Sequence, residues 1–224
     1  MLQEENKKFW EEIIMKIAVI GASGKAGANI VEEALIRGYE VTAFVRDASK
    51  VSNSKVNVIE KDIKALTTDD IKGFDAVVNA FGAPFGSEQL HVELGQHLID
   101  IFQGVSTRLI VVGGAGSLYV DPELSTKVMD TADFPEMFYP TASNQGRNLE
   151  DLKASSVNWT FLSPAGFFDP EGKRSGTYKV GGDQLILNDQ QESYISYSDY
   201  AIAIVDEIDN ANYVKARFSV VGPH

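Results

Sequence analysis

The chain has 224 residues, of which 44% are hydrophobic and 23% charged, a composition typical of a globular domain with a large core. It contains no cysteine, which excludes disulfides, thiolate nucleophiles and iron–sulfur clusters. With 32 acidic and 20 basic residues its formal net charge is −12, and it has no basic run that could neutralise phosphates, so no nucleic-acid partner is expected.

Residues 1–14 are rich in charge and lack the apolar core of a signal peptide. Met15 directly precedes an apolar run, so this segment is either an N-terminal extension ahead of the natural start or a short surface helix. No apolar run approaches the ~20 residues that a membrane span needs. We therefore expect a cytoplasmic protein without a membrane partner, either a monomer or a homodimer.

From Met15 onward, short apolar runs alternate with longer segments of helical periodicity. The runs expected to form strands are 16–20, 39–45, 56–59, 75–81, 108–112, 158–162 and 217–221. Helices are expected around 30–35, 90–101, 144–154 and 199–208, with Ser196 or Ser198 as the N-cap of the last. Strands that are apolar throughout are buried on both faces, as in a parallel sheet covered by helices.

This alternation predicts an α/β protein with a doubly wound parallel sheet, a Rossmann fold, forming a single domain over residues 15–224. Two irregular excursions, 115–140 and 166–195, follow the fifth and sixth strands and would form a small substrate-side appendage. Ligands bind outside the carboxyl ends of such strands, so we expect both excursions to serve as substrate walls or lids.

A glycine-rich turn, GASGKAG over residues 21–27, connects the first strand to the first helix. Gly21 would permit the tight turn, Gly24 would let the backbone approach a pyrophosphate, and Gly27 would let helix and strand pack closely. The pyrophosphate would rest on the helix N-terminus, formed here by Lys25 and Ala26, where unpaired N–H groups and the helix dipole favour an anion. The motif predicts a dinucleotide site, and the alternative is a plain strand-to-helix turn.

The end of the second strand bears on the choice of nucleotide. Arg46 comes first off that strand, and its guanidinium can bind a 2′-phosphate with two hydrogen bonds, assisted by Lys25 and Ser23. In the alternative, Asp47 binds the ribose hydroxyl of NAD and the basic side chains are solvated. The sequence favours NADP over NAD.

Several further motifs carry a family resemblance. On these motifs taken together, the chain resembles the NAD(P)H-binding, NmrA-like atypical short-chain dehydrogenase/reductases, and within them the NADH-flavin reductase subgroup related to biliverdin reductase B. The motifs are MKIAVIGASGKAG at 15–27, VRD at 45–47, EKDI at 60–63, VVNAFG at 77–82, VVGGAGSL at 111–118, YPTA at 139–142, SPAGFF at 163–168, YKVGGD at 178–183 and ISYSDYA at 195–201.

The resemblance implies roles for matching residues. Asp62 and Ile63 would border the adenine. Ala80, Phe81 and Gly82 would pass beside the adenosine ribose and the pyrophosphate, and Ser163, Pro164 and Ala165 would meet the nicotinamide.

The sequence departs from that superfamily at its usual catalytic pair, Tyr-x-x-x-Lys. Tyr139 stands where the tyrosine is expected, but Ser143 replaces the lysine. A tyrosine without that partner keeps a pKa near ~10 and is a poor base at neutral pH. A flavin or quinone accepts hydride into a conjugated system and needs no positioned acid, so a planar acceptor of that kind, with flavin as a substrate, is favoured.

Tyr139 and Ser117 are the candidate catalytic residues, the latter as a hydrogen-bond donor to the acceptor or simply a turn serine. Aromatic and apolar residues of the two excursions could stack on the acceptor or form the core of the appendage: Tyr119, Phe134, Met137, Phe138, Phe167 and Phe168. No metal site is expected, because His91 and His97 lie six positions apart on one predicted helix.

Two functions from different classes fit these features. One is an NAD(P)H-dependent oxidoreductase that transfers hydride to a flavin, quinone or similar small-molecule acceptor. The other is an NmrA-like, non-catalytic NADP(H)-binding redox sensor, which the missing lysine fits equally well. A sugar-nucleotide epimerase or carbonyl reductase is disfavoured by the absence of Tyr-x-x-x-Lys.

Overall fold

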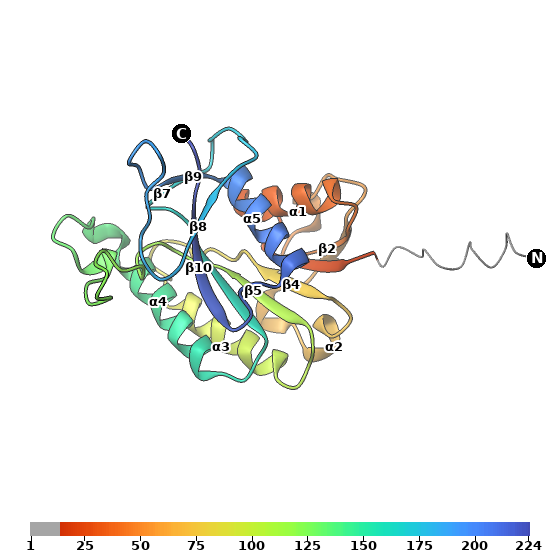
Figure 1. Cartoon of the computed structure of the whole chain (residues 1–224). Helices are drawn as coiled ribbons and strands as arrows, with labels where there is room; N and C mark the ends of the chain where they lie inside the picture. The colour runs from red at the N-terminus through yellow and green to blue at the C-terminus, as the bar shows by residue number, and fades with distance from the viewer. Residues whose placement is uncertain (1–13) are drawn as a thin grey trace, which may run out of the picture.

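The computed structural model describes residues 14–224, so the predicted extension 1–14 lies almost wholly outside the described residues. At its centre is a sheet with strand order β3-β2-β1-β4-β5-β6-β10-β8 (Figure 1). Every neighbouring pair is parallel except β10 and β8, which pair antiparallel. The strands are β1 Lys16–Ile20, β2 Glu40–Val45, β3 Asn57–Glu60, β4 Ala76–Asn79, β5 Arg108–Val112, β6 Trp159–Ser163, β8 Lys179–Gly181 and β10 Ala216–Val221.

Helices cover both faces of the sheet, which confirms the doubly wound α/β fold (Figure 1). Strand β1 is apolar throughout because both of its faces are buried under helices. Ile17 and Val19 belong to the core cluster shared with α1 and α5, whereas Ala18 and Ile20 belong to the cluster shared with α3 and α4. The helices are α1 Lys25–Ile36, α2 Thr68–Ile71, α3 Leu90–Phe102, α4 Tyr139–Ala154 and α5 Tyr197–Asn210.

The strand order reverses between β1 and β4. From β1 the chain winds outward through β2 to β3, and then returns to place β4 on the other side of β1. The loops that leave β1 and β4 therefore diverge and open a crevice at their carboxyl ends, which is where ligands bind in open α/β sheets.

Two helix starts differ in how well the sequence predicts them. Helix α4 begins at Tyr139, five residues before the expected Asn144, because Pro140 lies in its first turn, where a missing N–H costs nothing. Helix α5 begins after Ser196, whose Oγ accepts a hydrogen bond from the N–H of Asp199 at 3.0 Å. Of the two predicted N-caps, Ser196 is therefore confirmed.

The excursion at 166–195 contains strands that the sequence did not predict. Strands β7 (Phe167–Asp169) and β9 (Tyr194–Ser196) pair parallel in a separate two-stranded sheet, while β8 joins the edge of the main sheet. Asp199, fully buried at the start of α5, anchors the segment between them. Its carboxylate accepts the N–H groups of Ser175 and Gly176, both at 2.9 Å.

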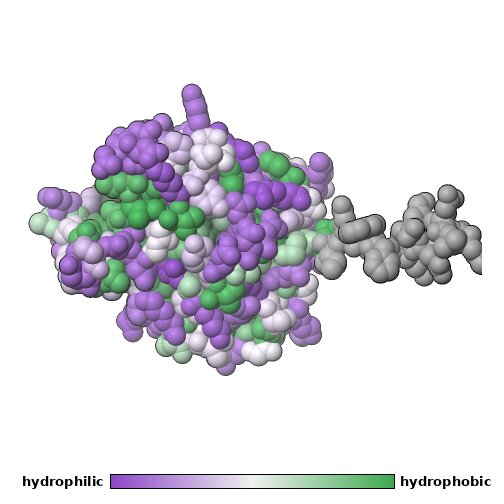
Figure 2. Space-filling view, viewed as in Figure 1, coloured by the Kyte–Doolittle hydropathy of each residue, from purple (hydrophilic) through white to green (hydrophobic). Residues whose placement is uncertain are grey.

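The excursion at 115–140 contains two short 3₁₀ helices, Val128–Asp130 and Glu136–Phe138. Arg217 of β10 connects the two excursions, because its guanidinium donates to the carbonyl of Ser117 at 2.9 Å and pairs with Asp183. Apolar side chains gather on the face over β7 and β8 (Figure 2), and Val180 of β8 is nearly half exposed. Over residues 14–224, no helix has the length and hydropathy required to cross a membrane.

Candidate functional site

The glycine-rich turn leaves no room for side chains at two positions. Gly21 has φ +76°, and a Cβ there would lie 2.8 Å from the carbonyl oxygen of Ala80 at the end of β4. A Cβ on Gly27 would lie 2.3 Å from the carbonyl oxygen of Gly21. The turn therefore presses α1 against the carboxyl ends of β1 and β4, which requires glycine at both positions.

The N-terminus of α1 lacks the partners that usually occupy a helix start. Its N-cap is Gly24, which provides no side-chain cap, and its first turn contains no acidic residue. The first N–H groups of a helix have no intrahelical acceptor and carry the positive end of the helix dipole. This end of α1 can therefore bind an anion with backbone N–H groups alone.

A cavity of about 370 Å³ opens at this helix end. It combines nine residues that the sequence analysis assigned to the coenzyme: Gly21, Ser23, Gly24, Arg46, Asp62, Ile63, Ala80, Phe81 and Gly82. These residues come from the loops after β1, β2, β3 and β4, so the cavity follows the carboxyl edge of the sheet across the reversal of strand order.

The cavity is cationic although the chain carries a net charge of −12. Three lysines line it beside Arg46, namely Lys50, Lys61 and Lys64, and the only acidic residue among its lining residues is Asp62. Two of these lysines also have carboxylate partners outside the lining: the Lys61 Nζ lies 2.6 Å from Asp70 and the Lys50 Nζ lies 4.0 Å from Asp47. A cleft lined by charges of one sign concentrates ligands of the opposite sign. Sequence reasoning missed the three lysines, although Lys61 and Lys64 flank Asp62 and Lys50 is one short turn beyond Arg46.

The two carboxylates that could bind a ribose hydroxyl each use one oxygen, Oδ1, to cap a local turn. Asp62 caps a 3₁₀ turn by accepting the N–H of Lys64 at 2.9 Å. Asp47 caps the next turn by accepting the N–H and the Oγ–H of Ser49 at 3.0 and 2.6 Å, and these hydrogen bonds lower the pKa of Asp47. These caps leave the Oδ2 of each carboxylate for a ligand, and Arg46, exposed at the end of β2, lines the same cavity.

Other predicted coenzyme residues do not line this cavity. Lys25, Ala26 and Gly27 lie in the first turn of α1, and the Nζ of Lys25 pairs with Glu171 of the segment between β7 and β8 at 2.5 Å. Ser163, Pro164 and Ala165 are buried after β6, and the Ser163 hydroxyl has no hydrogen-bond partner within residues 14–224.

The two candidate catalytic side chains lie in different environments. Ser117 is buried, and its Oγ accepts a hydrogen bond from Arg217 at 3.1 Å. This contact gives Ser117 a structural partner, and its role as a hydrogen-bond donor to the acceptor stays a prediction. Tyr139 is 45% exposed at the start of α4, and one turn later Ser143 donates its hydroxyl to the carbonyl of Pro140. The tyrosine thus lacks the family's lysine partner.

Of the aromatic and apolar residues predicted to stack on the acceptor, some are packed inside the protein and the others are exposed. Phe168 is packed between Tyr197 and Tyr200, with ring centroids 3.9 and 4.7 Å away, and therefore belongs to the core. Tyr119 lies beneath the Arg217 guanidinium, and Phe134 is half-buried, whereas Phe167 is exposed beside Tyr194. Met137 and Phe138 are exposed directly before α4.

The two helix α3 histidines have separate packing roles. The ring of His91 lies edge-on against Phe81, and burial lowers its pKa, so it is neutral at pH 7. The Nε2 of His97 lies 3.1 Å from the carbonyl oxygen of Leu66. Within the part of the chain that the structure describes, no group of three or more acidic or histidine side chains could hold a metal ion.

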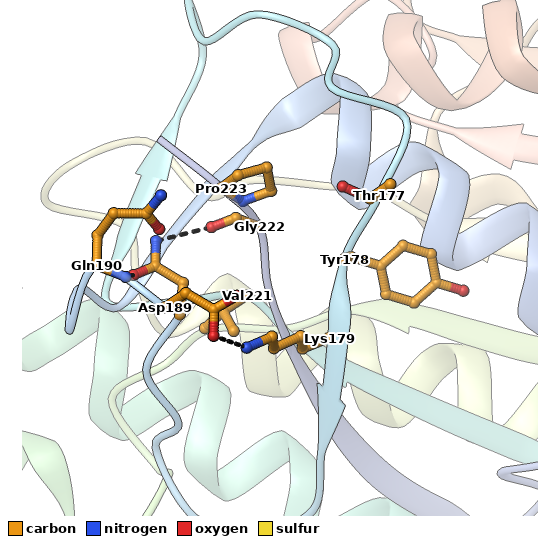
Figure 3. A pocket seen from close by; sticks show the side chains of 9 residues that line it. Thr177, Tyr178, Lys179, Asp189, Gln190, Val221, Gly222 and Pro223 are labelled. Atoms are coloured by element: carbon orange, nitrogen blue, oxygen red, sulfur yellow. Dashed lines mark hydrogen bonds and ion pairs between the residues drawn. The ribbon is translucent and has the colours of Figure 1, made fainter.

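A second cavity, of about 280 Å³, lies away from the glycine turn, between β8, residues 188–190 and the chain end (Figure 3). Its polar side chains satisfy one another. Lys179 pairs with Asp189, and the side-chain amide of Asn188 donates to the carbonyl of Gly222 at 2.9 Å. We therefore assign no ligand to it.

The doubly wound sheet, the glycine turn and the cationic cavity define a dinucleotide-binding protein of the Rossmann class. Comparison with known proteins agrees with this class. The sequence pattern of the NAD(P)H-binding family matches residues 21–211, and the chain belongs to that family.

Three similar proteins span a range of sequence identity. The uncharacterized protein YwnB of Bacillus subtilis is 58% identical over 209 residues, covering 92% of this chain and 98% of YwnB. The crystal structure of a Streptococcus pneumoniae protein, named as a proposed NADH-flavin reductase, is 44% identical with a TM-score of 0.90 and covers 93% of this chain and 100% of that one. An anaerobilin reductase from Escherichia coli, 20% identical with a TM-score of 0.70, covers 93% of this chain and 98% of that one and shares the fold.

Proposed function

We propose that the protein is an NADP(H)-dependent reductase that passes hydride to a flavin, a quinone or a similar planar acceptor. The observation that carries the proposal is the single cavity that connects the uncapped N-terminus of α1 to four cationic side chains. Its membership of the NAD(P)H-binding family and its likeness to the streptococcal protein support the same reading.

The residues fit the proposed coenzyme in three places. The N–H groups at the start of α1 would bind the diphosphate, and the glycines there leave space for it. Asp62 and Ile63 would border the adenine. Arg46, with Lys50, Lys61 and Lys64 on the cavity wall, would bind the 2′-phosphate that distinguishes NADP(H) from NAD(H).

A bound reduced nicotinamide supplies the hydride, so the protein needs only to orient it and to admit an acceptor. A conjugated acceptor takes up two electrons with that hydride and receives its second proton from water. Position 143, where the resembled superfamily has its catalytic lysine, is a serine, so Tyr139 lacks the partner with which that superfamily transfers a proton to a ketone oxygen.

A redox sensor that binds NADP(H) without turnover is the second candidate, and the serine at position 143 fits it equally well. One experiment separates the two. NADPH and NADH affinities are measured by coenzyme fluorescence, and coenzyme oxidation is followed with FMN, riboflavin and a soluble quinone. The reductase predicts turnover with at least one acceptor, whereas tight NADPH binding without turnover on any of them would support the sensor.

A further inference from the structure

Two exposed aromatic rings lie side by side, one in the loop after β4 and the other directly before α4. Phe85, in the loop 80–89 after β4, is 70% exposed, and Phe138, directly before α4, is 44% exposed. Their ring centroids are 6.4 Å apart with planes tilted by 37°. We call these residues the aromatic pair. Exposing two large rings together costs hydrophobic free energy that a bound apolar ring would recover.

The aromatic pair lies where the nicotinamide half of a coenzyme would extend. The loop that carries Phe85 begins at Ala80, Phe81 and Gly82, which line the cavity. The first turns of α4, which follow Phe138, pack over the end of β5, since a Cβ on Gly114 would lie 2.1 Å from the Gln145 Oε1. A coenzyme with its diphosphate at α1 and its adenine beside β3 extends across β4 and β5.

The two segments that carry the aromatic pair are acidic. The loop 80–89 and the excursion 115–140 together contain a single basic residue, Lys127. Their acidic residues are Glu88, Asp121, Glu123, Asp130, Asp133 and Glu136. Glu88 and Glu136 lie in the same short turns as the aromatic pair. A hydrogen bond from the N–H of Gly86, at 2.8 Å, lowers the pKa of Glu88, so this carboxylate is ionised at neutral pH.

We infer that the aromatic pair binds the hydride acceptor and that this acceptor is an uncharged planar ring, such as riboflavin or a neutral quinone, instead of one that bears phosphate or carboxylate groups. The inference rests on the proposed function and names its acceptor class. In the step with riboflavin, the C4–H bond of the nicotinamide breaks, the hydride forms an N–H bond at N5, and water provides the proton for N1. The coenzyme is oxidised by two electrons and the flavin is reduced by two.

Riboflavin and FMN provide a direct test, because they share one ring system and FMN adds a phosphate. With saturating NADPH at low ionic strength, kcat/KM for riboflavin should exceed that for FMN roughly fivefold, the size expected for one or two carboxylates about 10 Å from a phosphate in water. The ratio should approach one in 0.5 M salt, which screens such interactions. Equal values, or a preference for FMN or a bilin carrying propionates, would overturn the charge argument.

Variants then locate the site. The double change Glu88→Gln and Glu136→Gln should reduce the riboflavin-to-FMN ratio at least twofold, while Glu150→Gln, on the far part of α4 where it pairs with Lys153, should leave the ratio as in the wild type. Phe85→Ala and Phe138→Ala should each raise the KM for riboflavin fivefold or more without changing the Kd for NADPH. Leu187→Ala, which removes an apolar side chain that is 46% exposed, close to the 44% of Phe138, is the matched control.

Binding without turnover keeps this inference separate from the proposed function. Quenching of riboflavin fluorescence, measured with NADP⁺ present, reports affinity even if no acceptor is reduced. If NADPH does not bind, the proposed function fails. If riboflavin binds equally well to the wild type and to both phenylalanine variants, the acceptor site is elsewhere and the inference fails, whatever the activity.

Discussion

Replacing Arg46 by alanine should distinguish the two coenzymes. Arg46 is exposed at the end of β2 and lines the cavity, so its interaction with a phosphate is best taken at the dielectric constant of water. Two opposite unit charges 4 Å apart then interact by about 1 kcal/mol, and a doubly charged 2′-phosphate gives about 2 kcal/mol. This corresponds to a roughly 30-fold rise in the Kd for NADPH.

NADH lacks the 2′-phosphate, so its Kd should change less than about threefold by the same electrostatic argument. Both constants can be measured by fluorescence titration at 0.05 and 0.5 M salt, where the NADPH preference of the wild type should shrink because salt screens exposed charges. Lys153→Ala, on the far part of α4, serves as the control and should leave both constants unchanged. An equal loss of affinity for both coenzymes would refute the assignment of Arg46 to the 2′-phosphate.

Three further substitutions test other parts of the account. Gly24→Val should weaken the binding of NADPH and of NADH alike by about 100-fold or more in titrations, because the valine methyl groups would enter the space left for the diphosphate. Unchanged affinity, with an intact circular dichroism spectrum, would contradict the site. Tyr139→Phe should lower kcat/KM with riboflavin less than about threefold, whereas a loss near 100-fold would identify a true proton donor. Gly95→Ala should lower the free energy of unfolding, measured in urea, by about 1–3 kcal/mol, because the new Cβ would lie 1.9 Å from the Asn148 Nδ2. The control Gly73→Ala, at a position with open space around it, should change the free energy of unfolding by under ~1 kcal/mol. A Gly95→Ala variant more stable than the wild type would refute this packing.

The sequence predicted the fold well because its signals are local. Strands such as β1 are apolar on both faces, which only a covered parallel sheet explains, and the glycine turn marks where the first strand meets the first helix. The start of α4 was misplaced because Pro140 reads as a helix breaker unless it is known to lie in a first turn. Strands β7, β8 and β9 are each three residues long, too short for alternation to reveal them.

The candidate site was only partly predictable, since it depends on how loops from distant parts of the chain meet. The positions of Arg46 and Asp62 follow from strand ends, but which way Lys50, Lys61 and Lys64 point depends on 3₁₀ turns capped by Asp47 and Asp62. The partner of Ser117 is Arg217, 100 positions later, which no local pattern around Ser117 could indicate. Likewise, no local pattern brings Phe85 beside Phe138.

The central claim is that backbone N–H groups at the start of α1 hold the diphosphate of a nicotinamide coenzyme. A crystal structure of the protein with NADP⁺ tests it most directly. The account predicts diphosphate oxygens within hydrogen-bond distance of the N–H groups at Gly24 and Lys25, the adenine beside Ile63, and the 2′-phosphate next to Arg46. A helix end that stays empty while the coenzyme binds elsewhere, or crystals that take up no coenzyme at concentrations far above physiological levels, would contradict it.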